Sequence, residues 1–182
     1  KAIKSGDAHV VTGTIESITP GGITLKSGQH LEADIIITAT GLKLNVLGDV
    51  ALSVDGTAVD LGQTYAYKGL AYAGVPNLCS VFGYINASWT LRSDLICEYV
   101  CRLLKFMDEH QKRRCVPRLS KADSDMAARP FVDGFTPGYL TRIMNQLPNQ
   151  GDRAPWLNTQ NYQHDVEQMS RAPIEDGVMC FD

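Results

Sequence analysis

The sequence has no long apolar run: nowhere do the roughly 18 consecutive apolar residues that a transmembrane helix requires follow one another. The N-terminus also lacks the charged-then-apolar layout of a signal peptide. We therefore expect a chain without a transmembrane segment that resides in the cytoplasm. Basic clusters are equally scarce, because the formal net charge is -3 and the longest basic run is Lys112–Arg114. Nucleic-acid binding is disfavoured, since it requires a concentrated basic surface.

The chain is also poor in residues that bind metal ions or form disulfides. It has five cysteines, an odd number without a C-x-x-C pair, and four histidines that lie far apart in the sequence. These spacings argue against a disulfide framework and a zinc site, and we predict no metal site. Cys97 and Cys101 share a helix face and are expected in the core, because free cysteine packs as a small hydrophobic residue.

Motifs that carry chemistry are missing as well. No G-x-G-x-x-G follows a predicted strand, and Gly69–Gly74 lacks the Lys and Ser or Thr of a phosphate-binding loop. Neither a serine-centred elbow nor a Cys/His nucleophile pair is present. We therefore predict no catalytic residue in this chain. Because the first residue is Lys1 rather than methionine, and a strand pattern follows almost at once, we expect a piece of a longer protein.

The composition, 44 % hydrophobic and 20 % charged, is that of an ordinary globular protein. Residues 10–39 predict a β-meander, with turns at Pro20–Gly22 and Ser27–Gly28. The meander leads into Ile35–Ile37, where three successive apolar residues favour a strand buried on both faces. Such strands normally belong to parallel sheets that are covered by helices.

The middle of the chain combines a hairpin with a helix. The Asp55–Gly56 pair predicts a hairpin, and residues 78–83 predict a short apolar strand that ends on glycine. Residues 88–110 carry the clearest helical pattern, because apolar side chains recur about every four residues from Leu91 to Met107. Charged residues, among them Arg92, are expected mostly on the other side of this helix.

The pattern beyond residue 111 is mixed, with short helices predicted within residues 137–146 and 158–169. Its aromatic residues are expected to pack against the rest of the chain; they are Phe131, Phe135, Tyr139, Trp156 and Tyr162. The residues together indicate an α/β chain, or α+β as an isolated fragment, with a β-meander, a β-hairpin, one long helix near residues 88–110 and a mixed helical tail.

Two strand ends are candidate ligand sites. Thr40–Gly41 and Gly83–Asn86 each follow a predicted strand, and ligands of open α/β sheets bind there because loops and helix N-termini present free backbone N–H groups. Glycine at such a point lets a flat or phosphorylated ligand approach the main chain. The alternative is that both glycines only form turns.

Several motifs resemble one enzyme family. A-D-I-I-I-T-A-T-G (residues 33–41), Y-K-G with P-N and an F-G strand end (67–83), and N-A-S-W-T-L-R-S-D-L (86–95) closely resemble the C-terminal part of flavin-containing and Baeyer–Villiger-type monooxygenases. Three later motifs, R-P-F (129–131), F-T-P-G-Y (135–139) and A-P-W-L-N-T-Q-N-Y (154–162), are similar to the ethionamide-activating branch of that family. The resemblance covers nearly the whole chain, from about residue 8 onward.

The resemblance implies two Rossmann-like domains, one for FAD and one for NADPH. Residues 1–111 would be the C-terminal part of these FAD/NAD(P)-binding domains, and residues 112–182 an extension packed on it. In such enzymes a flavin C4a-peroxide inserts one oxygen atom into a ketone or into a sulfur or nitrogen centre of a small molecule. The partners of this chain would then be the missing N-terminal FAD and NADPH domains.

The resemblance also implies a set of cofactor-binding residues, namely Thr40, Gly41, Gly83, Tyr84, Asn86, Ala87, Ser88 and Trp89. Residues 33–41 would form the strand that returns to the FAD sheet, and residues 83–90 would lie beside the isoalloxazine. Because the glycine-rich FAD and NADPH fingerprints of the family have no counterpart in this chain, we expect the fragment alone to be inactive. The cut edge of its sheet favours self-association.

Some alternatives stay open on the sequence. Trp89 either packs at the helix start or lines the flavin or substrate pocket, and Tyr67–Lys68 is either structural or a cofactor contact. A second hypothesis is a non-catalytic interaction module that retains an FAD-domain remnant. An upstream reading frame with two G-x-G-x-x-G/A motifs would favour the enzyme. A disulfide reductase is disfavoured, because the paired redox cysteines of that chemistry are absent.

Overall fold

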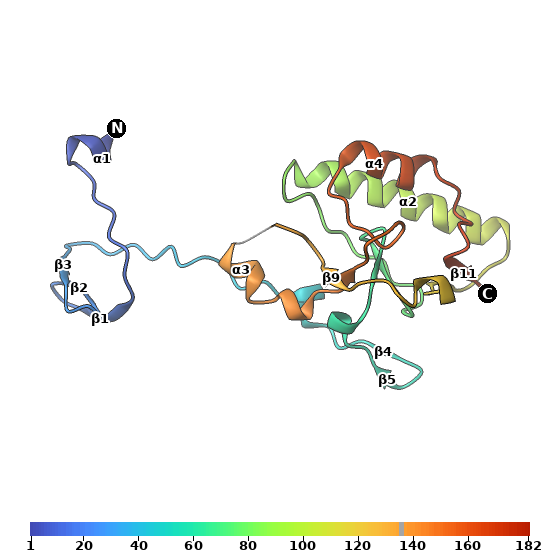
Figure 1. Cartoon of the computed structure of the whole chain (residues 1–182), viewed down its shortest axis with the longest axis horizontal. Coiled ribbons are helices and arrows are strands. Elements are labelled where there is room, and N and C mark those ends of the chain that lie inside the picture. Colours follow the sequence, from blue (N-terminus) through green and yellow to red (C-terminus); the bar gives the residue numbers. More distant parts are fainter. Residues whose placement is uncertain (135–136) are drawn as a thin grey trace. The chain divides into compact units, whose positions relative to one another are not determined.

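The computed structural model of the 182-residue chain describes residues 1–134 and 137–182 (Figure 1). Phe135, one of the expected tail aromatics, and Thr136 lie outside the described residues. The chain divides into two compact units, Lys1–Gly41 and Leu42–Asp182. This division is a different one from the boundary expected near residue 111, which stays a prediction.

The first unit is built on a three-stranded antiparallel meander. After a short helix, α1 (Ala2–Ser5), the strands β1 (Ile15–Thr19), β2 (Gly22–Leu25) and β3 (His30–Glu32) pair in chain order. Gly22 has a φ of +146°, and a Cβ there would lie 2.0 Å from the carbonyl oxygen of Leu31. Only glycine therefore lets β2 approach β3 this closely, and the predicted meander is confirmed.

The segment after the meander is not a strand. Residues 33–41 have no regular secondary structure, and Ile35 and Ile37 are 81 % and 86 % exposed. The prediction of a strand buried on both faces over Ile35–Ile37 is wrong for this chain. A strand of that kind needs a hydrogen-bonded neighbour on each side, and no described strand pairs with these residues.

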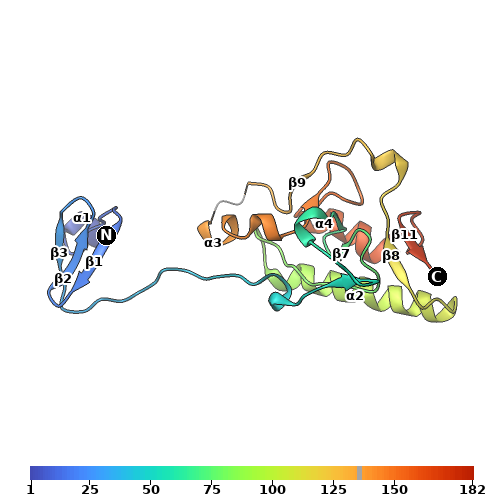
Figure 2. The same ribbon diagram turned by 90° about the horizontal axis from the view of Figure 1, so that it is seen from below.

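The second unit is organised around the long helix α2 (Trp89–Glu109), which confirms the helix predicted near residues 88–110. Figure 2 shows α2 along one edge of this unit, with β7, β8 and α4 to one side. The residues that α2 contributes to the main core are Leu95, Ile96, Tyr99, Leu103 and Met107. Trp156, which is fully buried, packs in the same core.

The buried face of α2 is rotated from the predicted one. Arg92 is buried, whereas Leu104, Cys97 and Cys101 are exposed, so the prediction that both cysteines lie in the core is wrong. Positions 92, 96, 99 and 103 follow one another at four-, three- and four-residue spacing, which places Arg92 on the face that enters the core.

Short antiparallel pairs complete the second unit. The predicted hairpin is confirmed as β4 (Ser53–Val54) and β5 (Thr57–Ala58), with both turn residues at positive φ. The other pairs are β6 (Ala66–Tyr67) with β7 (Ala71–Tyr72), β8 (Cys115–Pro117) with β11 (Met179–Phe181), and β9 (Arg129–Pro130) with β10 (Asn149–Gln150). The 3-10 turns are η1 (Val46–Asp49), η2 (Leu61–Gln63), η3 (Lys121–Asp123) and η4 (Met144–Gln146).

The strand predicted over residues 78–83 is wrong. Within it only Cys79 forms a bridge, to Ala71 of the two-residue strand β7, which is too short to pair with a longer segment. The short helices of the tail are confirmed as α3 (Gly138–Thr141) and α4 (Tyr162–Val166). Helix α4 continues into the π-helical turn η5 (Glu167–Arg171) and lies alongside α2 (Figure 1).

The mixture of helices and small sheets confirms the α+β character expected of the isolated chain. Every pair of named strands in the described residues runs antiparallel. The remnant of a Rossmann-like parallel sheet is therefore not seen in the described residues, and it stays an inference from the family resemblance. In the described part of the chain, no helix is both long and apolar enough to cross a membrane.

Candidate functional site

An apolar pocket of about 620 Å³ lies in the second unit. Its walls come from three segments: residues 42–48, residues 80–89 at the start of α2, and residues 139–148 together with Phe131. The second hydrophobic cluster of the unit, which includes Leu140 and Ile143, forms the floor. No charged side chain is among the described residues that line it, so the pocket suits a neutral, largely apolar ligand.

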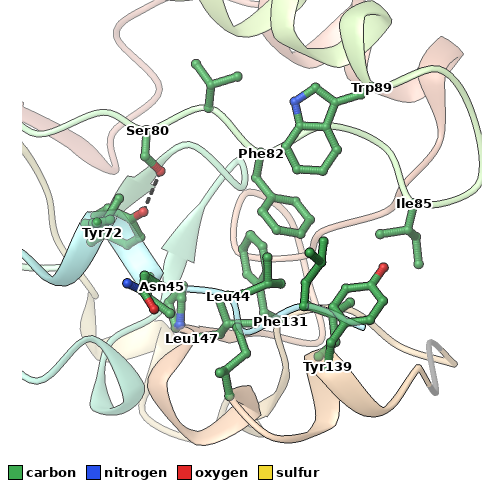
Figure 3. A pocket seen from close by; sticks show the side chains of 18 of the residues that line it. Leu44, Asn45, Tyr72, Ser80, Phe82, Ile85, Trp89, Phe131, Tyr139 and Leu147 are labelled. Atoms are coloured by element: carbon green, nitrogen blue, oxygen red, sulfur yellow. Dashed lines mark hydrogen bonds between the residues drawn. The ribbon is translucent and has the colours of Figure 1, made fainter. Parts of the chain in front are cut away.

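Aromatic rings form one wall of the pocket. Figure 3 shows the ring of Phe82 between those of Trp89 and Phe131. The centroid of Phe82 lies 5.0 Å from that of Trp89 and 5.0 Å from that of Phe131, the latter edge to face. Such contacts fix ring orientation beyond simple burial. The wall therefore offers flat, pre-positioned surfaces to a ligand.

The pocket has a polar end. The hydroxyl groups of Tyr72 and Ser80 are 2.5 Å apart (Figure 3), and the Asn45 side chain lies close by and donates to Asp49 at 2.7 Å. Burial raises the pKa of the Tyr72 phenol, which keeps it protonated at neutral pH. This end can therefore exchange hydrogen bonds with a carbonyl or similar neutral group.

A buried ion pair supports Tyr84, another lining residue. The Tyr84 hydroxyl donates to Asp165 Oδ2 at 2.8 Å, and Arg92 Nε lies 3.3 Å from the same oxygen. Thr159 donates to the other carboxylate oxygen at 3.2 Å. The Arg92 guanidinium lies over the Tyr84 ring, 5.5 Å from its centroid. Tyr84 is thus held in one orientation from two sides.

Burial shifts the pKa values of Tyr84 and Arg92 in this cluster. It raises the pKa of the Tyr84 phenol, and the hydrogen bond to Asp165 raises it further. Burial also lowers the pKa of the Arg92 guanidinium, which the Asp165 carboxylate partly offsets. Among the described residues, Arg92 Nη1 has no hydrogen-bond partner. The carboxylate of Asp165 is therefore the main compensation for a buried positive charge.

The structure gives Gly83 a packing role. A Cβ on Gly83 would lie 2.3 Å from Trp89 Cδ2 and 2.8 Å from Trp89 Cα. Glycine is thus required for the tight approach of this segment to the first residue of α2. Of the proposed cofactor residues, Tyr84 and Trp89 line the pocket and Gly83 positions Trp89.

The remaining proposed residues before α2 are exposed. Asn86, Ala87 and Ser88 form the turn that leads into the helix. Asn86 donates to the Gln160 carbonyl at 3.1 Å, and the Gln160 side chain accepts from the Ile85 backbone at 2.9 Å. Ser88 is the N-cap residue, but its side chain makes no capping hydrogen bond. The first-turn N–H groups of α2 therefore lack a side-chain cap from it.

Thr40 and Gly41 lie at the end of the first unit and are exposed. Gly41 has a φ of +88°, and a Cβ there would meet nothing within 4 Å. Within this chain, glycine at position 41 is therefore favoured by its positive φ and not by a close contact with a neighbouring residue. Tyr67 and Lys68 are both buried, and Lys68 Nζ lies 3.3 Å from Asp176 Oδ2, so this pair is structural in the described chain.

Sequence reasoning missed the segment 42–48, the Tyr72–Ser80 pair and the Arg92–Asp165 pair. Only the last had a usable signal, because Arg92 shares helical spacing with Ile96, Tyr99 and Leu103. The others come together through loops, for which the sequence carries no periodicity. Among the described residues, no cluster of three or more His, Cys, Asp or Glu side chains is placed to hold a metal ion.

Comparison with known proteins gives the decisive observation. The chain is 48 % identical over 181 residues to the FAD-containing monooxygenase EthA of Mycobacterium tuberculosis (strain CDC 1551 / Oshkosh) and 46 % identical over 181 residues to EthA of Mycolicibacterium smegmatis. It is 40 % identical over 182 residues to the probable FAD-binding monooxygenase AlmA of Acinetobacter baylyi. The chain is a relative of FAD-containing monooxygenases. The resemblance given by the sequence motifs is thereby confirmed.

The match to these monooxygenases covers 100 % of this chain but only 36 % of each relative. The chain thus spans about a third of the length of its monooxygenase relatives and corresponds to their C-terminal part. No protein-family model and no solved structure matches it. The monooxygenase relationship therefore rests on sequence identity along the whole chain.

Proposed function

We propose that this chain is the C-terminal part of an FAD- and NADPH-dependent monooxygenase that inserts one oxygen atom from O2 into a ketone or into a sulfur or nitrogen centre. The main support is the 40 to 48 % identity to FAD-containing monooxygenases along the whole chain. The monooxygenase activity is inferred from these relatives, which are named as FAD-containing or FAD-binding monooxygenases. The Baeyer–Villiger chemistry and the use of NADPH are inferred from the family resemblance of the motifs.

The pocket supports a small, neutral and mainly apolar substrate. Its volume of about 620 Å³ lies within the roughly 300–1,000 Å³ of known small-molecule sites. Its aromatic wall of Phe82, Trp89 and Phe131 would exclude water from the reacting atoms. The hydroxyl groups of Tyr72 and Ser80 at the polar end would orient a carbonyl oxygen by hydrogen bonding.

The residues of this chain fit one part of FAD and not the other. The pyrophosphate of a dinucleotide needs a glycine-rich turn before a helix, and this sequence contains none. The ring end is better matched, because α2 begins without a side-chain cap and the positive end of its dipole favours negative charge. When bound, FAD would supply the redox chemistry that activates O2.

We assign the ring-side contacts to the proposed residues Gly83, Tyr84, Trp89 and the turn Asn86–Ser88. Their role would be to hold and orient the ring and to separate it from water. Thr40–Gly41 would approach the cofactor once Ile35–Ile37 has strand neighbours from the N-terminal FAD and NADPH domains. Those domains are the partners that the proposal requires, and the cytoplasm is the compartment in which we expect the protein.

The test uses a full-length chimera in which this chain replaces the matching C-terminal third of the M. tuberculosis EthA relative. We expect the chimera to purify with bound FAD and to oxidise NADPH in the presence of an aryl ketone or a sulfide, with an oxygenated product. A chimera that folds but binds no flavin would contradict the proposal and favour a non-catalytic interaction module.

A pair of variants tests the pocket in the same chimera. Phe82→Ala removes the central ring of the aromatic wall and should raise KM for an apolar ketone about tenfold, because roughly 1–3 kcal/mol of apolar contact is lost. Phe106→Ala makes the same chemical change near the far end of α2, where Phe106 stacks on His110, and should leave KM unchanged. Equal effects of both variants on KM would contradict the assignment of this pocket as the substrate site.

A further inference from the structure

The outward face of α2 carries an uncharged row of side chains. Cys97, Cys101 and Leu104 follow at four- and three-residue spacing and are exposed, with Leu104 60 % exposed. These three residues, here termed the outer stripe, lie on the side of α2 opposite the main core.

The outer stripe differs from an ordinary solvated helix face. Such faces carry charged side chains, whereas here Asp94 and Asp108 stand at the two ends of the Cys97–Leu104 stretch and Glu98 and Lys105 lie along one edge. Free cysteine is among the most buried residue types, yet both cysteines of α2 are exposed. A helix that is apolar on two sides is normally covered on both.

We propose that the outer stripe is the docking surface for the N-terminal, FAD-binding part of the same polypeptide. This inference rests on the proposed function. The occupant follows from length, because nearly two thirds of each relative lies outside the region that this chain matches. The other face of α2 is already occupied by the core of its own unit (Figure 2).

The shape of the stripe suits a packed secondary-structure element. Two of its three side chains, Cys97 and Cys101, are small, and small contact residues let the backbones of two elements approach to the short end of the roughly 8–10 Å range. Leu104 supplies one larger apolar side chain for a gap in the partner surface. The flanking Asp94 and Asp108 would mark the limits of the covered area.

Thiol labelling tests the coverage directly. The rates at which N-ethylmaleimide modifies Cys97 and Cys101 are measured by peptide mass spectrometry in this chain alone and in the EthA chimera. We expect at least tenfold slower labelling of both thiols in the chimera. Cys115, which is buried in the main core, should label slowly in both proteins and reports that the unit is folded.

A matched pair of substitutions tests the contribution of the stripe. Leu104→Asp places a carboxylate within it and should restore fast labelling of Cys97 and Cys101 in the chimera. Lys105→Asp introduces the same group one residue further along, on the charged edge, and should leave the protection intact. The Lys105 side chain is 75 % exposed and its ion pair with Glu109 spans 3.8 Å, so its loss has little effect on folding.

The outcomes separate docking from the proposed function. Protected thiols in a chimera without flavin would uphold the docking surface and contradict the monooxygenase proposal. Equal labelling in the chain alone and in the chimera would overturn the docking surface, whatever the flavin content. Protection in this chain alone that rises with protein concentration would identify a second copy as the occupant and would also overturn it.

Discussion

The Arg92 guanidinium and the Asp165 carboxylate form a buried ion pair that joins α2 to α4, with Nε and Oδ2 3.3 Å apart. Arg92 is only 1 % exposed, and Tyr84 of the pocket donates to the same carboxylate. One carboxylate therefore serves two purposes: it compensates a buried charge and it orients a side chain of the pocket.

Asp165→Ala should lower the free energy of unfolding by about 3–5 kcal/mol, because it leaves the Arg92 charge buried without a counter-ion. Urea unfolding of this chain measures the change. Glu109→Ala is the control, since it removes one partner of the exposed Lys105–Glu109 pair and should cost less than about 0.5 kcal/mol. Equal costs for the two variants would show that Arg92 reaches water in solution.

Asp176 should govern part of the acid stability of the second unit. It accepts from the Tyr67 hydroxyl at 2.5 Å and from the N–H groups of Val178 and Met179 at 3.0 Å. Burial alone would raise the pKa of Asp176, but these hydrogen bonds and the Lys68 ammonium outweigh it and lower the pKa. Burial lowers the pKa of Lys68, although Asp176 is its ion-pair partner. The ion pair therefore stabilises the Asp176 carboxylate but does not fully offset the cost of burying the Lys68 ammonium.

The sign of the effect follows from this lowered pKa. Between the folded and the ordinary pKa of Asp176 the unfolded chain binds the extra proton, so stability rises with pH there. The contribution is complete above the ordinary aspartate pKa of about 3.9 and is lost as the pH falls through the folded value. Asp176→Asn should weaken the pH dependence of the free energy of unfolding between about pH 5 and pH 3, as measured by urea unfolding. Parallel curves for the two proteins would contradict this assignment.

Gly83→Ala should destabilise the second unit by about 1–3 kcal/mol, as overpacking does, because its Cβ would lie 2.3 Å from Trp89 Cδ2. Thermal unfolding gives the cost, and tryptophan fluorescence reports the displaced ring. In a Trp89→Ala background the cost should shrink. Gly138→Ala, at the first residue of helix α3, is the control and should not destabilise the unit, because alanine favours a helix more than glycine does. An unchanged midpoint for Gly83→Ala would contradict the contact.

Ile35 and Ile37 should drive self-association of this chain, because both are more than 80 % exposed and their segment has no strand partner. Sedimentation velocity at rising concentration should show oligomers. Ile35→Ser with Ile37→Ser should suppress them, whereas Lys26→Ser, at an exposed position of the same unit, should not. A monomer at every concentration would contradict the expectation.

Local patterns predicted the elements that are complete within the chain. The meander, the Asp55–Gly56 hairpin and α2 depend on turn chemistry and on one amphipathic period, and all three are present. Ile35–Ile37 failed because a doubly buried strand depends on neighbours that this chain does not supply. Residues 78–83 failed for the same reason, since only the Cys79 bridge forms.

The candidate site was only partly accessible to sequence reasoning. Tyr84 was named because it follows a predicted strand end and Trp89 because of the family resemblance, and both line the pocket. Its other walls, residues 42–48 and 139–148, are loops and short turns whose convergence depends on tertiary packing. Arg92 was assigned to the wrong face because charge was given more weight than its four-residue spacing from Ile96.

Flavin content is the most direct test of the central claim that this chain is one part of an FAD-dependent monooxygenase. The visible spectrum and the molar ratio of FAD to protein are measured for this chain alone and for the EthA chimera, both incubated with excess FAD and then desalted. The account predicts a colourless chain alone and close to one FAD per chimera. Stoichiometric flavin on the chain alone, or none on a folded chimera, would contradict it.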